Sequence, residues 1–509
     1  MRLARRTGRQ DITAMPLGLD TPSTFGMVFF VLGPAFLSAK QTMSVEEAAI
    51  FTWHIGICAI VLSGLFKFVC AFGSNWIRRA VPRAGLLGSL AAIALVLISF
   101  LPLLEVLRHP IVGFVALAIV LTTLVARVRL PGRVPGALGA LIVAALIYYL
   151  MKETGTLGQV APESLDPREG LLPYEWLSAF QFKWLGALDE TVQYLPIIIP
   201  FALATVVGGI DCTESAAAVG DEYNTNHVIG VEAIATLVGG MCGGVIQTTP
   251  YIGHPAYKAM GGRAAYTLAT ALFVGSAGLL GYFGFLYLII PKAAVFPILI
   301  FVGLEITAQS FHATPKRHYP AVVFACIPAL AALVMIFMNS LQGQYAVHVE
   351  DLNSQIADLR AQSSSDDLDK LKTTGEMLKT ISGTPDKKLI GKPLGPLGHQ
   401  IETMRSLANG FIVISLLWGA ALAFIIDHRL WTAATYFAIA AGCSLFGIIH
   451  SPFVDGKMFL PWQLDEAMRE TPIRYAIAYL SVAVIMIAWG WWLQSRNPAD
   501  SKIGEDFKS

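Results

Sequence analysis

Long apolar runs alternate with short polar breaks over most of the chain. Runs of about 20 apolar residues have the length of a helix that crosses the hydrocarbon core of a bilayer. The pattern predicts an all-α polytopic membrane protein with about fourteen membrane segments, some of them half-helices or tilted pieces because they are too short to cross alone. The segments fall near 23–39, 49–73, 84–104, 110–128, 134–151, 191–217, 228–245, 249–261, 264–290, 293–309, 319–338, 409–427, 431–450 and 474–494.

Two of these segments begin with a similar interruption. One reads Asp-Thr-Pro-Ser-Thr-Phe-Gly over 20–26, and the other reads Thr-Thr-Pro-Tyr-Ile-Gly over 248–253. Pro250 has no amide hydrogen and disfavours a helical conformation at the preceding residue. We therefore expect a short extended piece that ends near Pro250, followed by a half-helix from Tyr251 to Met260. Paired interruptions in two halves are typical of inverted repeats that flank a site near the middle of the membrane.

Composition supports the membrane assignment and narrows the function classes. The chain is 55% hydrophobic and 14% charged, whereas a soluble domain carries about 25% charged residues. A net charge of +1 without a basic patch argues against a nucleic-acid partner. The six cysteines have no metal-ligand spacing, and no Cys–His or Ser–His set suggests an enzyme, so we expect no cofactor. The expected partners are the lipid bilayer and a small-molecule substrate.

The lysine and arginine bias of the short loops predicts the orientation. Basic loops alternate with neutral or acidic ones, which places both termini in the cytoplasm of a multi-pass protein of the cell (inner or plasma) membrane. One loop disagrees with this rule, because 218–227 should be cytoplasmic but carries Asp221 and Glu222. The expected regions are a cytoplasmic tail (1–19), a first-repeat membrane region (20–151), an outward loop (152–190), a second-repeat membrane region with the substrate site (191–338), an extramembrane insertion (339–408), C-terminal membrane helices (409–494) and a second cytoplasmic tail (495–509).

Two acids late in an apolar segment are the sharpest site candidates. Asp211 and Glu214 are one helical turn apart, so both can face the same way. An ionisable side chain at membrane depth costs about 2.5–3.5 kcal/mol on insertion scales, and such residues usually mark a functional site. We expect Glu214 to bind the substrate and to carry a coupling proton. The alternatives are a helix-end carboxylate for Glu214 and a cap or brace for Asp211.

Further candidates lie around the interruptions. Each has a structural alternative: the polar side chains could cap the half-helix, a lone histidine is often a packing residue, and aromatic rings often pack or lie at the interface. These candidate substrate-binding residues are Gln247, Thr248, Thr249, Tyr251, Ile252, Gly253, His254 and Phe25. Three other charged residues, Glu232, Glu305 and Lys67, are expected to lie near helix ends and to cap or snorkel.

The segments around Glu214 and Gln247-Thr-Thr-Pro-Tyr-Ile-Gly-His resemble the nucleobase–ascorbate (xanthine/uracil permease-like) transporters, closest to their adenine, guanine and hypoxanthine branch. Asp211-Cys-Thr-Glu214 falls on that branch's two acids, and Thr248 to Gly253 falls on its Thr-Thr-Thr-Tyr-Ile-Glu. Thr21 to Pro34 resembles the family's third, broken helix, which puts Phe25 where the family has a base-stacking aromatic residue. Two departures are Gly253, which replaces the second binding acid, and Ala218, which replaces a histidine.

The resemblance implies core and gate domains in inverted repeats, an elevator-like motion, often a homodimer, and symport with protons or sodium. It implies a permease for a purine or a related heterocycle. The alternatives are a carrier for another small polar or anionic solute on the same fold, and a membrane receptor or scaffold. Since nothing in this sequence precedes the third-helix equivalent, we also expect the last two segments, 431–450 and 474–494, to pack into the space left by the first two helices of the first repeat and so cover the broken helix after Pro22.

The insertion 339–408 generates a first prediction. Residues 345–381 suggest one or two amphipathic helices followed by a loop, with no polar group at membrane depth. Replacing residues 345–400 with a short Gly/Ser linker should preserve solute uptake, because the entropy cost of loop closure grows slowly with loop length. Uptake into cells that express each variant measures this. Lost uptake in a protein that still folds would instead assign the insertion a role in partner binding or gating.

Overall fold

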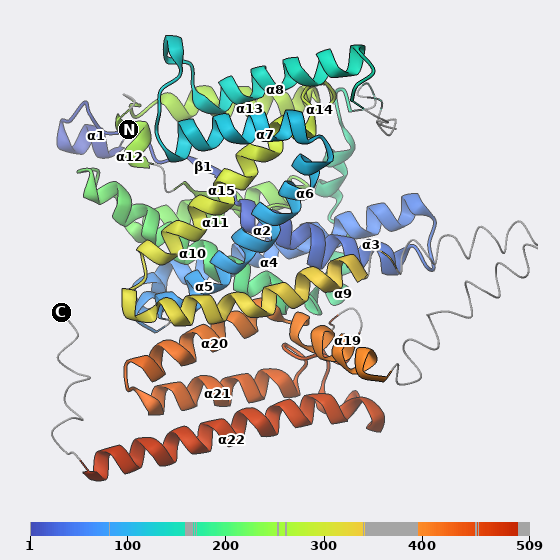
Figure 1. Ribbon diagram of the computed structural model, residues 1–509, viewed down its shortest axis with the longest axis vertical. Coiled ribbons are helices and arrows are strands. Elements are labelled where there is room, and N and C mark those ends of the chain that lie inside the picture. The colour runs from blue at the N-terminus through green and yellow to red at the C-terminus, as the bar shows by residue number, and fades with distance from the viewer. Residues whose placement is uncertain are drawn as a thin grey trace, which may run out of the picture.

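Helices form almost all of the regular structure of the described residues, as expected for an all-α membrane protein (Figure 1). The structure, a computed structural model, describes residues 2–80, 82–157, 166, 168, 170–251, 254–259, 262–338, 341, 395–453, 456 and 458–496. The first part contains α1 (Arg2–Thr7), β1 (Leu17–Leu19), α2 (Thr21–Met27), η1 (Val28–Leu32), α3 (Gly33–Ala39), α4 (Val45–Ala80), α5 (Arg83–Ile93), η2 (Ala94–Phe100), α6 (Leu101–Arg108), α7 (Pro110–Val120), η3 (Leu121–Val125), η4 (Pro131–Arg133) and α8 (Gly136–Glu153).

The second part begins with the short elements of the expected outward loop, η5 (Glu175–Gln181), η6 (Lys183–Ala187) and α9 (Leu188–Val192). It continues with α10 (Leu195–Ala218), α11 (Thr225–Met241), β2 (Thr248–Pro250), α12 (His254–Ala259), α13 (Tyr266–Leu280), α14 (Phe283–Ile289), α15 (Lys292–His312), η7 (Lys316–His318), a helix over 319–338, α19 (Gly395–Ala408), α20 (Phe411–Ile426), α21 (Leu430–Leu445), η8 (Pro461–Gln463) and α22 (Glu466–Arg496). The helices expected between 345 and 381 lie outside the described residues.

Each expected membrane segment corresponds to helical structure among the described residues, but the helices differ in length. Six are long and apolar enough to cross a bilayer by themselves, and three helix pairs bent by more than 40° pass the same criterion together. The expected segment 264–290 is one such pair, because α13 and α14 meet at 95°. Gly281 terminates α13 with φ +76°, in the left-handed region that glycine adopts without strain.

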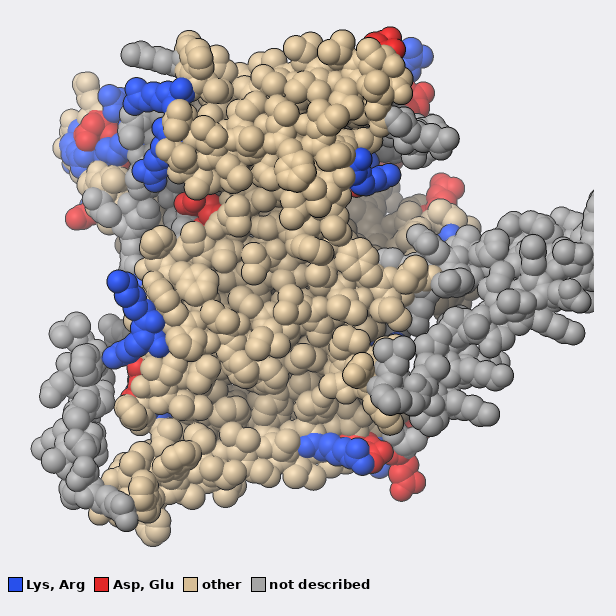
Figure 2. Space-filling model, viewed as in Figure 1, with Lys and Arg blue, Asp and Glu red and all other residues tan. Residues whose placement is uncertain are grey.

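The surface agrees with a membrane location. Figure 2 shows one face of the molecule on which apolar and uncharged side chains cover the middle, while charged side chains gather toward the margins. Many large apolar side chains are exposed, among them Leu146, Leu272 and Val484. Large exposed apolar surfaces are unusual for a soluble monomer but expected against lipid tails. The chain is therefore an all-α, polytopic membrane protein.

The two interruptions meet in a short antiparallel pair of strands. Leu17 pairs with Pro250, Gly18 with Thr249 and Leu19 with Thr248. The extended piece expected to end near Pro250 is confirmed. The half-helix does not begin at Tyr251 as expected, because the Tyr251 amide donates to the Pro16 carbonyl (3.1 Å) and so continues the strand pairing. α12 begins at His254, and Ile252, Gly253 and Met260 lie outside the described residues.

Because β1 and β2 run antiparallel, the chain leaves their pairing in opposite directions, into α2 from one end and into α12 from the other. Asp20 caps α2, since its carboxylate accepts a hydrogen bond from the Ser23 amide (2.9 Å). Two strand-plus-helix units in opposite orientation are the arrangement expected of inverted repeats.

Glycines allow α4 and α11 to pack closely on each other. A Cβ atom on Gly64 of α4 would lie 2.7 Å from Leu237 Cγ of α11, and one on Gly240 of α11 would lie 3.1 Å from Ile60 Cγ2 of α4. Small residues at the contact are the usual means by which membrane helices bring their backbones together. The close approach positions the polar side chains of α4 and α11 against each other.

The C-terminal helices do not lie where the sequence suggested. Instead of packing beside the first interruption, α21 and α22 pack mainly on each other and on α20, at one end of the molecule (Figure 1). The buried residues of this cluster include Ile414 and Leu417 of α20 and Ala440 of α21. The elements that pack on α2 are η1, η2 and α10, so α21 and α22 do not cover the first interruption as expected.

One histidine joins the elements of this C-terminal layer. The His450 ring is fully buried and stacks on Tyr475 of α22 with a 3.8 Å centroid separation. Its Nδ1 atom lies 2.9 Å from the Ser406 carbonyl oxygen of α19, and its Nε2 atom lies 2.8 Å from the Tyr479 hydroxyl of α22. His450 thus links α19 to α22 through both ring nitrogens, at a hydroxyl that also accepts from Trp418 Nε1 of α20 (2.9 Å).

We expect His450→Ala to lower the free energy of unfolding by about 2–4 kcal/mol, because it removes two buried hydrogen bonds and a ring stack. Thermal unfolding of the purified protein in detergent, followed by tryptophan fluorescence, measures the effect. His428→Ala is the matched control, since His428 is exposed. Equal stabilities of the two variants would contradict the assigned role.

Candidate functional site

The two interruptions cross where β1 pairs with β2. A buried ion pair lies at this crossing. Lys67 of α4 and Glu232 of α11 approach to 2.7 Å (Nζ to Oε1), and both side chains have 0% exposure. Neither carboxylate oxygen of Glu232 has an aligned hydrogen bond from the described residues, so the contact is one of charge. Removing one partner of such a buried pair costs about 3–5 kcal/mol, because the remaining charge is left uncompensated.

The same ammonium group binds the backbone of the second interruption. Lys67 Nζ donates to the Thr248 carbonyl oxygen (2.7 Å) and lies 3.5 Å from the Thr236 hydroxyl. The Thr248 amide donates to Thr236 Oγ1 (3.2 Å), and its hydroxyl donates to the Glu232 carbonyl (3.1 Å). Thr248, a candidate substrate ligand, therefore has its backbone and side-chain polar groups occupied by α4 and α11.

α10 approaches the crossing from a third side. A Cβ atom on Gly209 would lie 2.9 Å from Glu232 Oε2 and 3.8 Å from the Pro250 ring. The Cys212 thiol donates to the Pro250 carbonyl (3.4 Å). A side chain at Gly209 would thus require the Glu232 carboxylate, which is held by Lys67, to move.

Gln247 links the two interruptions. Its side-chain oxygen accepts from the Ser63 hydroxyl of α4 (2.7 Å), and its carbonyl accepts from the Asp20 amide (3.0 Å). The Asp20 and Gln247 side chains are both buried. Gln247 was a candidate for binding a planar solute, and the structure shows that it also holds the start of α2 against β2.

The other candidates differ in their positions. Thr249 is half-buried in β2, and Tyr251 is 49% exposed with its ring near Tyr257. Phe25 of α2 is half-buried and stacks with Phe29. Asp211 and Glu214 follow Gly209 in the last part of α10, by two and five residues, and their side chains lie outside the described part of the structure.

Sequence reasoning missed the ion pair. Lys67 and Glu232 were expected to snorkel or cap near helix ends, and this is wrong for both, because each lies in the interior of a long helix and is fully buried. A signal was present, since Lys67 is flanked on both sides by apolar residues and its apolar run has no other charge. An intramembrane charge of each sign in two separate segments suggests a pair. Glu305, the third such residue, is exposed in α15.

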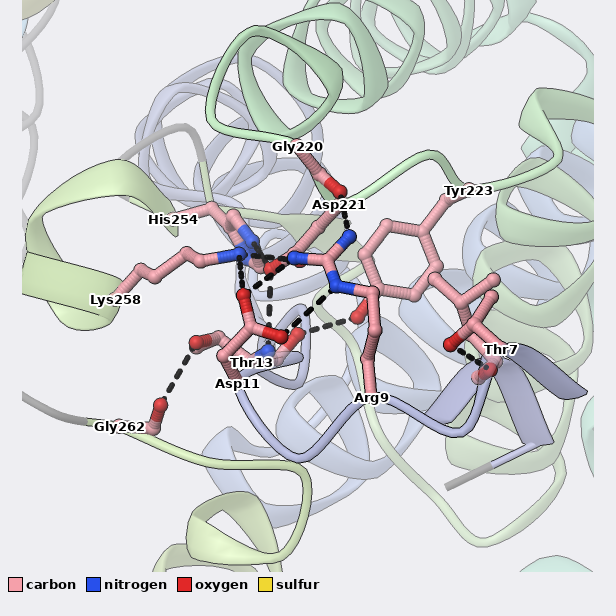
Figure 3. Close-up of polar contacts among 11 residues, drawn as sticks. Thr7, Arg9, Asp11, Thr13, Gly220, Asp221, Tyr223, His254, Lys258 and Gly262 are labelled. Carbon is pink, nitrogen blue, oxygen red and sulfur yellow. Dashed lines mark hydrogen bonds and ion pairs between the residues drawn. The ribbon is translucent and has the colours of Figure 1, made fainter. Parts of the chain in front are cut away.

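A second polar cluster surrounds Asp221 in the loop between α10 and α11 (Figure 3). Asp221 Oδ2 lies 3.0 Å from His254 Nε2 and accepts from the Thr13 amide (3.1 Å), while Oδ1 accepts from Lys258 of α12 (2.5 Å). Burial by itself would raise the pKa of Asp221, but the hydrogen bonds from Lys258, the Thr13 amide and His254 outweigh it and lower the pKa.

The N-terminal segment is tied into this cluster. Arg9 donates to the Gly220 carbonyl (2.5 Å) and lies 3.7 Å from Asp221 Oδ1, and Tyr223 donates to the Thr13 carbonyl. The N-terminal segment, the Asp221 loop and α12 therefore contact one another. The loop-charge rule expects these three segments to lie on the same side of the membrane. The acidic loop that disagreed with that rule has its buried carboxylate surrounded by two basic side chains.

His254, a candidate substrate ligand, lies in this second cluster. Its side chain is fully buried, its Nε2 atom faces Asp221, and Nδ1 has no hydrogen-bond partner among the described residues. Along the chain, β2 lies between Glu232 and His254. His254 therefore belongs to the Asp221 cluster and not to the Lys67–Glu232 pair.

These features define a polytopic membrane protein with a buried ion pair beside two paired strands. No family model matches the chain, and no curated protein matches it. Among solved structures, the fold is similar to that in "The transmembrane domain of a cyanobacterium bicarbonate transporter BicA", with a TM-score of 0.44 and 15% sequence identity over 65% of this chain and 84% of that chain.

We expect Asp221→Asn to lower the free energy of unfolding by about 1–3 kcal/mol at neutral pH, because hydrogen bonds to a charged acceptor are lost. A carboxylate with a lowered folded-state pKa contributes stability above its ordinary pKa of about 3.9 and loses it only as pH falls through the folded value. The contribution of the Asp221 charge should therefore not change between about pH 8 and pH 5.

Thermal unfolding over this pH range tests both expectations. Glu222→Gln is the control, because Glu222 is the exposed neighbour of Asp221 in the same loop. A fully stable Asp221→Asn protein would show that the cluster contributes nothing to the fold.

Proposed function

We propose that the protein is a secondary transporter, not an enzyme, which moves a small planar polar solute across the membrane with proton or sodium coupling. The proposed solute is a nucleobase, a purine or a related heterocycle. The observation that carries this proposal is the antiparallel pairing of β1 and β2 inside a membrane protein. Extended backbone at membrane depth is stable only where protein or a water-filled cavity satisfies it, and paired interrupted helices are the usual frame of a transporter's substrate site.

The charge balance at the crossing favours a neutral solute over an anion. Lys67 is in contact with Glu232, so its positive charge is compensated inside the protein. Asp20 adds a second buried carboxyl group beside the same crossing. An anion would therefore approach one buried cation and two buried acidic groups, which is unfavourable in a medium of low dielectric constant.

Glu214 is the residue we propose as the main substrate ligand and proton carrier. Its helix, α10, lies against β2 at Gly209 and Cys212, five and two residues before it. A carboxylate accepts hydrogen bonds and suits the N–H edge of a planar heterocycle, and in its protonated form it donates one. Phe25 of α2 is proposed as the stacking residue, following the family resemblance.

We expect Glu214→Gln to weaken nucleobase binding about tenfold or more and to flatten the pH dependence of uptake. A hydrogen bond to a charged group contributes about 1.5–3 kcal/mol, and 1.4 kcal/mol is a factor of ten in affinity. Glu214→Asp should lower affinity and keep the pH dependence, because it retains the titrating group one methylene further away. Uptake of radiolabelled bases into proteoliposomes at several pH values measures both quantities.

Glu222→Gln controls for loss of an acid near the same helix end, and it should behave as the unmodified protein. Unchanged affinity and an unchanged pH profile in Glu214→Gln would refute the role of Glu214. A thermal-shift panel tests the function itself, since a ligand of the folded state raises its apparent stability. Stabilisation by inorganic anions but by no nucleobase would favour the anion carrier.

A further inference from the structure

The Lys67 ammonium group has the surroundings of a bound metal cation. Three oxygen atoms of different kinds lie around Nζ: a carboxylate oxygen of Glu232 at 2.7 Å, the Thr248 carbonyl oxygen at 2.7 Å and the Thr236 hydroxyl at 3.5 Å. The side chain has no exposure to solvent. In transporters with interrupted helices, carbonyl oxygens of the unwound backbone together with acidic or hydroxyl oxygens are the groups that bind sodium.

We infer that the Lys67 ammonium group occupies the place of a coupling sodium ion. Because this cation is covalently attached to α4, a tethered cation, it neutralises the crossing of β1 and β2 permanently, and the crossing binds no sodium. This inference rests on the proposed function, and it excludes sodium binding at the crossing as the source of coupling. Its physical basis is charge: the buried carboxyl groups of Glu232 and Asp20 and the carbonyl oxygen of β2 require a positive group, since uncompensated charge in the membrane interior is costly.

A tethered cation and a free one have different consequences. A sodium ion that binds and leaves on opposite sides of the membrane links solute movement to its own gradient, but an ammonium group on α4 cannot leave the protein. Substrate movement through this crossing is therefore independent of the sodium gradient. Any coupling at this protein has to come from a different group.

The site should accept a free cation once the tether is removed. Lys67→Ala takes away the ammonium group and its alkyl chain and leaves the oxygen atoms of Glu232, Thr236 and Thr248 in place. Thermal unfolding of the purified protein is compared in sodium, potassium and choline chloride at constant ionic strength, without any solute. We expect no difference among the three salts for the unmodified protein.

For Lys67→Ala we expect a lower unfolding temperature in choline and a saturable rise of several degrees with sodium, because a ligand bound only to the folded state stabilises it by mass action. The double variant Lys67→Ala/Glu232→Gln should lose the rise, since it removes the anionic ligand. Lys40→Ala, at an exposed lysine, is the matched control and should show no salt preference.

Either of two results overturns the inference: saturable stabilisation of the unmodified protein by sodium, or a folded Lys67→Ala protein that does not respond to sodium. If Lys67→Ala does not fold in any salt, Lys67→Gln decides, because it keeps N–H donors on a side chain one atom shorter, without the charge. It should fold and respond to sodium, and a folded Lys67→Gln without that response, or one that fails to fold in every salt, overturns the inference. The assay contains no solute, so its outcome is separate from that of the nucleobase panel.

Discussion

The interior of this protein depends on one charge contact, that between Lys67 and Glu232. Two helices, α4 and α11, place opposite charges where neither can reach water, so each charge is stable only in the presence of the other. Lys67 also binds the Thr248 carbonyl, which connects the ion pair to the backbone of β2. Through the β1–β2 pairing the contact extends to the start of α2, and through Gly209 it reaches α10. Four helices and both strands are thus positioned around one buried ammonium group.

Much of the fold follows from the sequence, because the bilayer restricts what a chain can do. Apolar runs of helical length predict membrane helices, since lipid cannot satisfy exposed backbone groups. The interruption ending near Pro250 was also predictable from proline's missing amide hydrogen. The location of α21 and α22 was not, because contacts between apolar helices depend on shape and not on any pattern that one segment carries. The 95° bend at Gly281 belongs to the same class, since glycine permits a turn without requiring one.

The sequence indicated where the two interruptions lie but not the ion pair between the helices that hold them. The sequence places Gln247, Thr248 and Thr249 at the second interruption, and the structure brings them to the first. The ion pair was missed because Lys67 and Glu232 lie in segments distant along the chain. The residues around either one do not indicate which residue is its partner. A charge within an apolar run signals that the side chain needs either the interface or a partner, but it does not say which of the two it reaches. Only the packing of α4 on α11, through Gly64 and Gly240, distinguishes these cases.

The strand pairing also constrains how the protein is made. β1 leaves the ribosome well before its partner Thr248–Pro250, which follows only after α2 to α11 have been synthesised. Until then the amide and carbonyl groups of Leu17–Leu19 have no partner in the chain, and the hydrocarbon region offers them none. Contacts between residues so far apart form late in folding. The first interrupted helix therefore stays at the membrane surface or within the translocation machinery until the second has been synthesised. It enters the bilayer only when β2 is available to pair with β1.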